Sequence, residues 1–565
     1  MPKSLSWLLS SALFVAGTPA IAATWVNTAT HAIPLIQAAP LGPMNSNATL
    51  TITVALKMPD AAALATLVRE QNTPGSGLYG TVITPGEFNA QYAPSPAAVA
   101  RVKAYLTKMG LNNFAVEPNR LFVSANGTVA QVEAAFNTSL SWFSQNGAKV
   151  FVNTTPAQVP SALGNDVLSV LGLNNVRYTA QPITPCAVST PTCVRDYYDP
   201  STYWLAYDVG TVPNARNTSI AVMAEGNVAG VIKDLRIFEK AMSLHAVPVS
   251  VEQVGLWSPD TSGQDEWDLD TQYTTGMAGY VDHLYIYATT DLTDQDTALE
   301  FNQWVTQDLA KAANASFSIC EFFPYLDGTM VADDQVFLEG ASQGQTLFSS
   351  TGDTGSFCSV GTPNGVPAGA PFVGYPATST YVVGVGGTTL LTNANGTYNA
   401  EVAWYAGGGG ISQFEYSPYW QNNVIPTNNT TAGINYRGIP DISMDADPNT
   451  GAEIYVNGQL EYVGGTSLSS PLAVGSWARL LNVHPKLGFA PPKLYGGYPT
   501  FGTVPNPPSG LTESEDGFND ILTGADGLYQ SLPYYDYTTG MGTFDISQKN
   551  AVLSAPPPST FVLNR

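Results

Sequence analysis

The chain has 565 residues, of which 44% are hydrophobic and only 12% are charged, about half the share of roughly 25% that is usual in globular domains. Acidic residues outnumber basic ones by 44 to 21 and give a net charge of −23, which argues against a nucleic-acid partner, because phosphate binding needs clustered Lys and Arg. The length predicts two or more domains. If all carboxylates were protonated, only the 21 Lys and Arg and the 4 His would carry charge, so the composition indicates acid tolerance. A merely acidic secreted protein would have the same composition.

The first 23 residues have the pattern of a secretory signal peptide. Lys3 precedes an apolar stretch over residues 5–17, and the Ala-Ile-Ala-Ala run at 20–23 offers a cleavage site with small residues. No later stretch reaches the ~18 apolar residues needed to span a bilayer. We therefore expect a secreted, extracellular protein in an acidic environment, monomeric and without a membrane partner.

Export permits disulfide bonds, and the chain has four cysteines. Four cysteines allow three pairings. The short spacing of Cys186 and Cys193 favours a local loop, which leaves Cys320 to pair with Cys358. The other two pairings stay open at this point.

Residues 24–175 are expected to form a compact α+β domain, in which strand and helix patterns alternate from about residue 48. Asp60, Thr84, Ser95 and Thr128 each stand where a side chain can cap the start of a helix. Thr84 and Thr128 are followed three residues later by the Glu or Gln of a capping box. The expected strands, including a hairpin that turns at residues 146–147, cover 49–56, 120–124, 140–144 and 149–153.

Residues 176–196 are rich in Pro, Thr and Ser and predict an exposed linker, where proteolytic processing concentrates. After it, residues 197–555 alternate short apolar runs with helical stretches, which is typical of a parallel sheet with covering helices. The expected strands cover 219–224, 284–288, 316–319 and 346–350, and one expected helix covers 298–313. Active sites in such folds lie at the carboxyl ends of the strands.

Ser467 is the candidate nucleophile. It ends a Gly-Gly-Thr-Ser run and precedes a helical pattern over 468–480, so its hydroxyl would stand at a helix N-terminus, where backbone N–H groups stabilise negative charge. A turn with a capping serine would have the same pattern. A serine nucleophile needs a base, yet none of the four histidines stands in a His-Gly-Thr setting, which argues against a subtilisin-type Ser-His-Asp triad.

Carboxylates are the alternative base. Glu266 and Asp270 lie four residues apart and share one face of a helix, where two like charges raise one pKa and let the pair share a proton. Such a base can work in acid, where histidine is protonated. Two acids on a solvated helix face would have the same spacing.

Asp353 follows the expected strand 346–350 and begins an Asp-Thr-Gly-Ser run. In its protonated form it could donate a hydrogen bond to an oxyanion, which again requires acid. The same run is the signature of pepsin-like aspartic peptidases, but these need two such loops, and the chain has no second Asp-Thr/Ser-Gly. The parallel α/β pattern also opposes an all-β pepsin fold.

Asp520 and Asp536 flank a loop rich in Gly and Tyr. Two carboxylates with backbone carbonyls would suit a hard, oxygen-seeking ion such as calcium. A solvated acidic loop would have the same composition.

Together these features resemble the sedolisin family of serine-carboxyl peptidases, over nearly the whole mature region and a kumamolisin-like activation domain. The motifs that carry the resemblance are Tyr-Ala-Pro-Ser at 92–95, Asn-Gly-Thr at 126–128, Val-Leu-Gly-Leu at 170–173, Gly-Gly-Thr-Thr at 386–389, Trp-Gln at 420–421 and Pro-Asp-Ile at 440–442. The resemblance implies a subtilisin-like α/β catalytic domain with a parallel sheet. It also implies an α+β, ferredoxin-like prodomain that acts as an intramolecular inhibitor.

The resemblance also implies a role for each candidate residue. Ser467 would be the nucleophile, Glu266 the general base and acid, Asp270 its partner, and Asp353 the acid that stabilises the oxyanion. One structural calcium ion would be held by Asp520, the carbonyls of Ile521, Leu532 and Tyr534, and Asp536.

Two places depart from the family's pattern. The family commonly has Gly where Leu532 and Tyr534 stand, which keeps carbonyl ligation but leaves the shape of the loop open. The usual Ser-Trp-Gly of the substrate cleft is Ser-Ile-Cys at 318–320, so the specificity of the family does not carry over.

The expected function is a secreted, acid-active serine-carboxyl endopeptidase that hydrolyses proteins and peptides through an acyl-enzyme on Ser467. It would be made as a zymogen that activates itself by cleavage near residues 176–196. A tripeptidyl-peptidase of the same family is the nearest alternative and would need a cleft closed beyond the third subsite. A non-catalytic secreted binding protein on the same scaffold is a different class, which the presence of all four candidate catalytic residues disfavours.

Overall fold

The computed structural model describes residues 24–34, 38–145, 148–178, 180, 182–184, 196–357, 371–428, 435–498 and 516–555. The expected signal peptide, the hairpin turn at 146–147 and the cysteines Cys186, Cys193 and Cys358 lie outside these residues. Cys320 is disulfide-bonded, and its pairing with Cys358 stays a prediction. Within the described ranges, no helix has the length and apolar character to cross a membrane.

The N-terminal unit is built on a four-stranded antiparallel sheet of order β4-β5-β3-β9. The central strand β3 places Val54 opposite Val123 on one side and Val170 on the other, and all three are fully buried. The chain order β3-α3-β4-β5-α4-β9 combined with this sheet order is the ferredoxin-like arrangement, as predicted for the prodomain. The bounds are β3 Thr49–Leu56, α1 Ala61–Asn72, α2 Pro85–Gln91, α3 Pro96–Lys108, β4 Asn112–Val116, β5 Phe122–Thr128, α4 Val129–Phe136, β6 Leu140–Gln145, β7 Ala148–Asn153 and β9 Val167–Leu171.

The four predicted capping side chains each accept a hydrogen bond from the third residue of their helix, and both capping boxes form. The predicted strand 120–124 is partly wrong, because β5 begins only at Phe122. Arg120 has a φ of 62°, and a residue in this left-handed region cannot continue a strand. Its guanidinium instead donates to the carbonyls of Asn89 and Pro94, both at 2.5 Å.

The C-terminal unit is organised by a ten-stranded sheet of order β11-β12-β10-β13-β15-β17-β21-β25-β24, with β18 paired to β17. All neighbours are parallel except β17–β18 and β24–β25, which confirms the predicted α/β fold with a parallel sheet. The strands are β10 Ile220–Glu225, β11 Val249–Gln253, β12 Leu284–Thr289, β13 Ala312–Ala315, β15 Thr346–Ser350, β17 Val382–Thr392, β18 Tyr398–Ala403, β21 Ile442–Asp445, β24 Phe518–Asn519 and β25 Thr543–Phe544. The principal helices are α5 Pro200–Ala206, α6 Ala229–Ala241, α7 Gln264–Ala278, α8 Asp294–Gln307, α9 Phe322–Asp327, α10 Thr329–Ser342, α11 Thr466–Val483, α12 Pro491–Leu494 and α13 Ile546–Ser554.

Two predicted elements of this unit are misplaced. The helix expected over 298–313 is α8, which starts four residues earlier behind the cap Thr293 and stops at Asp308, whose φ is 51°. The strand expected over 316–319 is β13, which ends before Ser316. The run of small residues at 312–315 is fully buried, and in a buried segment of this length periodicity does not distinguish helix from strand.

Helices α7 and α11 pack against each other at a very short distance. A Cβ on Gly475 of α11 would lie 2.6 Å from the Cβ of Met277 and 2.8 Å from the carbonyl oxygen of Thr274, both on α7. Real Cβ atoms do not approach so closely, so this crossing requires glycine. The contact brings the first turns of α7 and α11, which hold Glu266 and Ser467, to the same end of the sheet.

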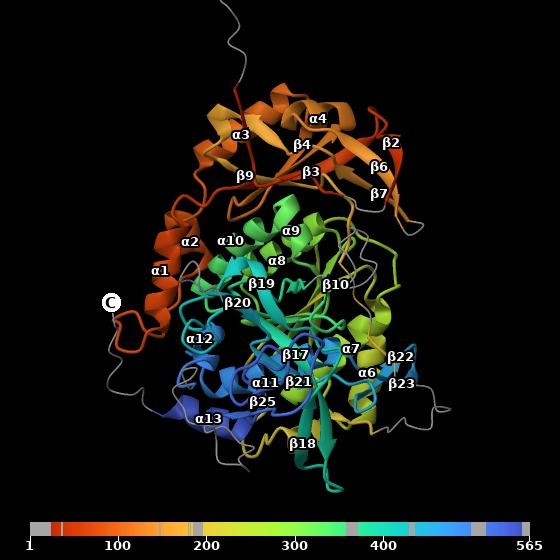
Figure 1. Cartoon of the computed structure of the whole chain (residues 1–565), viewed down its shortest axis with the longest axis vertical. Helices are drawn as coiled ribbons and strands as arrows, with labels where there is room; N and C mark the ends of the chain where they lie inside the picture. The colour runs from red at the N-terminus through yellow and green to blue at the C-terminus, as the bar shows by residue number, and fades with distance from the viewer. Residues whose placement is uncertain are drawn as a thin grey trace, which may run out of the picture.

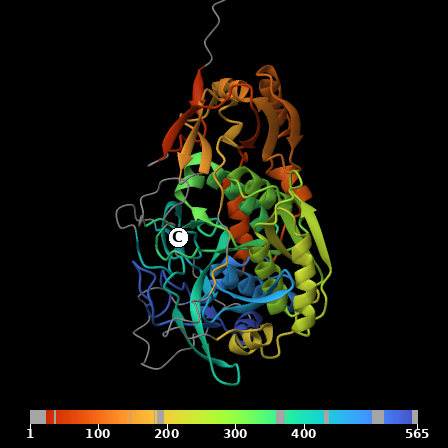
Figure 2. The same cartoon turned by 90° about the vertical axis from the view of Figure 1, so that its right-hand side faces the viewer.

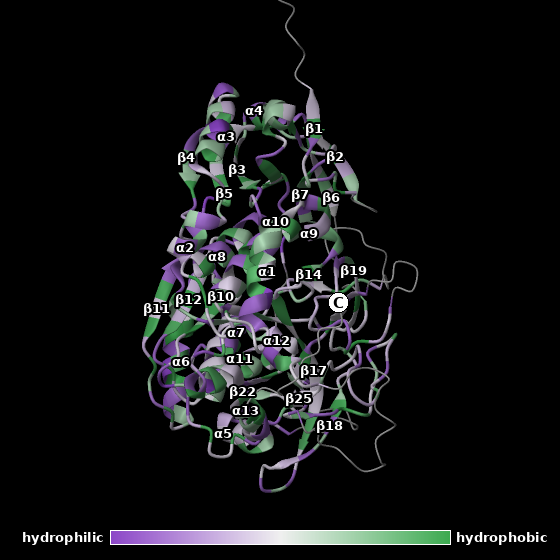
Figure 3. Cartoon of the chain, turned by 90° about the vertical axis from the view of Figure 1, so that its left-hand side faces the viewer, coloured by the Kyte–Doolittle hydropathy of each residue, from purple (hydrophilic) through white to green (hydrophobic). Residues whose placement is uncertain are grey.

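The prodomain sheet lies over α8, α9 and α10, while α1 and α2 run down beside the C-terminal unit (Figure 1). Figures 2 and 3 show this stacking from opposite sides, and Figure 3 shows hydrophobic residues on strands inside both units. Polar contacts join the units: Asn119 Nδ2 donates to Glu339 Oε2 at 2.7 Å, and Gln295 Nε2 donates to Thr53 Oγ1 at 2.8 Å. The N-terminal unit is therefore docked on the helices that cover one face of the ten-stranded sheet.

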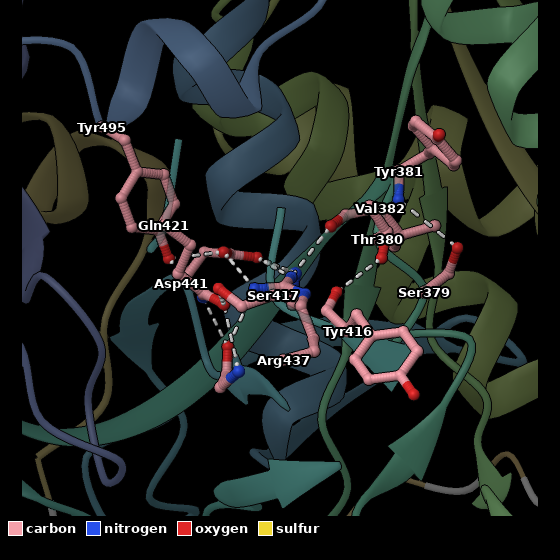
Figure 4. Close-up of polar contacts among 12 residues, drawn as sticks. Ser379, Thr380, Tyr381, Val382, Tyr416, Ser417, Gln421, Arg437, Asp441 and Tyr495 are labelled. Carbon is pink, nitrogen blue, oxygen red and sulfur yellow. Dashed lines mark hydrogen bonds and ion pairs between the residues drawn. The ribbon is translucent and has the colours of Figure 1, made fainter. Parts of the chain in front are cut away.

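A fully buried ion pair lies against strand β17 of the large sheet (Figure 4). The guanidinium of Arg437 donates to both oxygens of Asp441, at 2.7 and 2.6 Å, and to the carbonyl of Val382 at 3.1 Å. Asp441 also accepts from the Tyr495 hydroxyl at 2.7 Å and from the N–H of Gly384 at 2.8 Å. Each charge is thus satisfied by several partners, as a buried pair requires.

The substitution Asp441→Asn should destabilise the fold by about 3–5 kcal/mol, because it leaves the Arg437 charge buried without its counter-charge. Urea unfolding measures this loss. The control is Asp308→Asn at the more exposed Lys311–Asp308 pair, which should cost about 1 kcal/mol or less. Equal losses for the two variants would contradict this account of the pair.

Candidate active site

Ser467 lies in the first turn of α11, where the sequence predicts a helix N-terminus. The residue before the helix, Gly465, has a φ of 109°, a conformation that favours glycine. A Cβ on Gly465 would also lie 2.8 Å from Asp353 Oδ2. Glycine at 465 therefore lets the Asp353 carboxyl approach the start of the helix that carries Ser467, a residue that is only 5% exposed.

Glu266 and Asp270 lie one turn apart on α7, and both side chains are fully buried. Burial, followed by the charge of Asp270, raises the pKa of Glu266 well above its ordinary value. The Ser467 hydroxyl is near enough to lower this pKa, yet neither Glu266 oxygen has a hydrogen-bond partner among the described residues. Ser467 and Glu266 are thus close neighbours without a formed hydrogen bond, a geometry that can tighten when substrate binds.

Asp270 differs from Glu266 because it has hydrogen-bond donors. Ser316 Oγ donates to Asp270 Oδ1 at 2.6 Å. Burial raises the pKa of Asp270 well above its ordinary value; the hydrogen bond from Ser316 opposes that rise, and the Asn314 side chain is near enough to oppose it as well. The sequence motifs do not identify Ser316 or Asn314 as site residues; their only signal is their place at the carboxyl end of β13.

Asp353 follows β15 and faces the start of α11. Its Oδ1 accepts from the N–H and from the Oγ1 of Thr466, both at 2.8 Å. Burial raises the pKa of Asp353 to about 6, so the carboxyl is protonated and able to donate a hydrogen bond below that pH. A cavity of about 480 Å³ lies in front of these groups; it is lined by Ser467, Asp353, Ser316, Ile319, Phe372 and Gly408, among others.

The segment that joins the two units also lines this cavity, through Tyr178, Ala180 and Ile183. Ile183 pairs with Gly464, three residues before Ser467, by hydrogen bonds of 3.0 and 2.8 Å in the manner of an antiparallel strand. The N–H of Tyr178 donates to the carbonyl of Leu292 at 2.8 Å. The predicted exposed linker is therefore partly bound in the cleft, at those of its residues that the structure describes.

The alternatives to a carboxylate base find no support in the geometry. None of the four histidines lines the cavity. Two of them make polar contacts elsewhere, His283 with Ser250 and His484 with Asn550. The parallel sheet also contradicts the pepsin-like interpretation of the Asp353 loop, since those enzymes are all-β.

The five residues of the expected calcium site lie in one loop region. The N–H groups of Tyr534 and Leu532 donate to Asp520 Oδ2 and Asp536 Oδ2, both at 2.9 Å. Burial raises the pKa of Asp520 to about 7, and the nearby charge of Asp536 adds to the rise. No described residue donates a hydrogen bond to the carbonyls of Ile521, Leu532 or Tyr534. Two carboxyls that repel each other and three unbonded carbonyls fit an oxygen-ligated divalent cation.

This loop would depend on its carbonyls for ligation. Over the described ranges, no group of three or more His, Cys, Asp or Glu side chains is placed to hold a metal ion. Tyr534 has a φ of 68°, so it adopts a left-handed conformation that favours glycine.

Several carboxyl groups have a raised pKa because they are buried, so we expect the fold to be most stable in acid. Burial raises the pKa of Asp268 to about 9, of Glu339 to about 8, and of Glu401 to about 7. Each of these pKa values in the folded protein exceeds the pKa of roughly 4 that a carboxyl has in the unfolded chain. The stability that these groups contribute is therefore fully present below pH ~4 and is lost as the pH rises through 7–9. Lys549 acts in the opposite sense, because burial lowers its pKa to about 7.

The melting temperature of the full chain carrying Ser467→Ala should therefore fall between about pH 6 and pH 9. Asp268→Asn, which is neutral at every pH, should make this fall shallower. Differential scanning calorimetry across the pH range measures both effects. A melting temperature that rises from pH 5 to pH 8 would show that the carboxyls are not buried as described.

Comparison with known proteins supplies independent evidence on the family. Residues 37–176 match the family described as the pro-kumamolisin activation domain, and residues 270–494 match the subtilase family. Sedolisin of Pseudomonas sp. (strain 101) is 37% identical over 545 residues, which cover 91% of this chain and 89% of the relative. Xanthomonalisin of Xanthomonas sp. (strain T-22) is 32% identical over 92% of this chain and 68% of the relative.

A solved structure agrees with the sequence relatives. Pseudomonas sedolisin, a serine-carboxyl proteinase complexed with two molecules of pseudo-iodotyrostatin, superposes with a TM-score of 0.57 at 35% identity, over 64% of this chain and 98% of that chain. This likeness confirms the subtilisin-like α/β fold of the catalytic unit. The chain belongs to the sedolisin family of serine-carboxyl peptidases.

Proposed function

We propose that the protein is a secreted, acid-active endopeptidase that forms an acyl-enzyme on Ser467. The observation that carries the proposal is the neighbourhood of this hydroxyl, which stands beside the buried pair of Glu266 and Asp270 and near the protonatable Asp353. No histidine lines the same cavity. A serine in this setting has only carboxylates as its base, and carboxylates retain that ability in acid.

In the proposed chemistry, each of these side chains acts once in each half of the reaction, acylation and deacylation. Ser467 Oγ attacks the scissile carbonyl carbon while Glu266, supported by Asp270, takes the hydroxyl proton and later returns it to the leaving amine. Asp353, protonated below about pH 6, donates a hydrogen bond to the oxyanion. The need for a protonated Asp353 then limits activity at higher pH.

The proposal includes a zymogen. Ile183 binds the backbone of Gly464 beside the nucleophile, which supports a prodomain that acts as an intramolecular inhibitor until residues 176–196 are cut in acid. Secretion rests on the signal-peptide pattern of residues 1–23. A tripeptidyl-peptidase is the alternative with the same chemistry.

A structural calcium ion completes the proposal. Asp520, Asp536 and the carbonyls of Ile521, Leu532 and Tyr534 would hold it, and the ion would supply the positive charge that lets both carboxyls ionise.

Ser467→Ala should abolish self-processing and peptide hydrolysis in acid. Glu266→Gln, Asp270→Asn and Asp353→Ala should each lower turnover on the order of 10²-fold or more, since each removes a group that acts in the transition state. The assay is cleavage of a long peptide with a blocked N-terminus by the acid-treated protein at pH 3–7. An endopeptidase cuts this peptide, whereas a tripeptidyl-peptidase needs a free N-terminus.

The same assay separates the remaining alternatives. If the wild-type protein neither processes itself nor cuts casein in acid, the remaining interpretation is a non-catalytic binding protein. Activity that pepstatin abolishes and that survives in Ser467→Ala would show an aspartic peptidase. Activity only on peptides with a free N-terminus would show that the protein is a tripeptidyl-peptidase.

Removal of calcium with a chelator should lower the melting temperature, and added Ca²⁺ should restore it, because an ion that binds only the folded state stabilises it by about 2.7 kcal/mol at 100 times its Kd. Asp536→Asn should abolish the response. Asp545→Asn, which exchanges one good helix-capping residue for another at α13, should keep it. A chelator response that persists in Asp536→Asn would place the ion elsewhere.

A further inference from the structure

A line of buried hydrogen bonds runs from α11 through β13 to Asp270. Ser470 Oγ lies 2.6 Å from Asn314 Oδ1, and Asn314 Nδ2 lies 3.0 Å from Ser316 Oγ. Ser316 Oγ in turn lies 2.6 Å from Asp270 Oδ1. None of these four side chains is more than 1% exposed, so water does not compete for their hydrogen bonds.

The chemistry of an amide gives this line one direction. The amide oxygen of Asn314 can only accept, so it takes the proton of Ser470, and its nitrogen can only donate, so it donates to Ser316. With its oxygen accepting from Asn314, the single proton of Ser316 is free to point at Asp270. The other acceptor within reach, the carbonyl of Ser467, is farther away at 3.3 Å.

The two members of the carboxyl pair therefore differ in the hydrogen-bond donors that they face. Asp270 accepts a short hydrogen bond at one oxygen, whereas both Glu266 oxygens have no partner among the described residues. A buried carboxylate without donors costs far more free energy than a buried carboxylic acid. When the pair carries one proton, that proton lies on Glu266 and the charge lies on Asp270.

We propose that Ser470, Asn314 and Ser316 are positioning residues that hold the negative charge of the pair on Asp270 and so make Asp270 the terminal proton acceptor of the reaction. This inference rests on the proposed function of Ser467.

The proton transfers then form a two-step relay. The O–H bond of Ser467 breaks as its oxygen bonds to the substrate carbonyl carbon, and the proton forms a new O–H bond on Glu266. The proton that Glu266 already carried leaves for the second oxygen of Asp270, which has no partner among the described residues. The carbonyl electron pair moves to the oxygen that Asp353 stabilises, and the total charge is unchanged.

Other ionisable groups face the same pair. Asp353, from the loop after β15, and Asp265, from α7 itself, both raise the pKa of Glu266 and so favour its protonated form. Neither of them replaces the donor that Ser316 supplies to Asp270.

The test is the pH dependence of kcat for the acid-activated enzyme. Ser316→Ala removes the donor to the Asp270 carboxylate, so the pKa at which the pair loses its first proton should rise. The acid limb of the kcat–pH profile should then move to higher pH by about one to two units. kcat should fall on the order of 10-fold or more at the acid end, while KM stays near that of the wild type. Ser316→Thr, which keeps the hydroxyl, should restore the limb.

Two further variants grade the effect. Asn314→Leu and Ser470→Ala leave Ser316 in place but remove hydrogen bonds that orient its hydroxyl. Each should shift the acid limb in the same direction as Ser316→Ala, by a smaller amount. Ser476→Ala is the matched control, because it removes an equally buried α11 hydroxyl that donates to the Leu472 carbonyl at 2.7 Å, outside this line. Its acid limb should stay where the wild type has it.

Each outcome decides the inference. An unmoved acid limb in folded Ser316→Ala overturns it, and so does an equal shift in Ser476→Ala. If Ser316→Ala does not fold, an unmoved limb in Ser470→Ala overturns it instead. The proposed function fails separately, when wild-type protein is inactive in acid or Ser467→Ala is active.

Discussion

Two carboxyl groups one helical turn apart in a fully buried site cannot both ionise, and the arrangement around Ser467 depends on this constraint. Burial removes water from Glu266 and Asp270 and raises the pKa of both well above their ordinary values, which favours a proton shared by the pair. A shared proton makes the pair both a donor and an acceptor without any histidine. The proposed acid activity would thus follow from the carboxyl groups themselves, and the low content of basic residues in the chain only supports it.

The fold supplies this constraint through close backbone approach. Gly475 lets α11 pack against α7, and Gly465 lets the Asp353 carboxyl reach the first turn of α11. Ser316 and Asp353, which follow β13 and β15, then line the same cavity as Ser467. The ion pair of Arg437 with Asp441 contacts the backbone of β17 in the same sheet, at Val382 and Gly384.

Features that depend on local chemistry could be predicted from the sequence. The capping residues Asp60, Thr84, Ser95 and Thr128 are examples, because a cap needs only the next three residues. The shared helix face of Glu266 and Asp270 and the helix start at Ser467 are local in the same sense. The resemblance to a family then combined signals that are weak one by one.

Features that depend on tertiary contacts could not be predicted. The run at 312–315 gave no period that distinguishes a buried strand from the end of a helix, so β13 was misplaced. The same error hid Asn314 and Ser316, whose importance comes from Asp270 and Ser470 on two distant helices. The docking of Ile183 on Gly464 is equally non-local, since these residues are 281 positions apart in sequence.

The location of the proton in the carboxyl pair tests the account most directly. Infrared difference spectra of the inactive Ser467→Ala protein would report protonated carboxyl groups through their C=O stretch, with Glu266→Gln and Asp270→Asn added in turn. The account predicts that Glu266→Gln removes a protonated-carboxyl band that is present at neutral pH, while Asp270→Asn removes a carboxylate band. The reverse assignment, or the loss of two carboxylate bands, would contradict it.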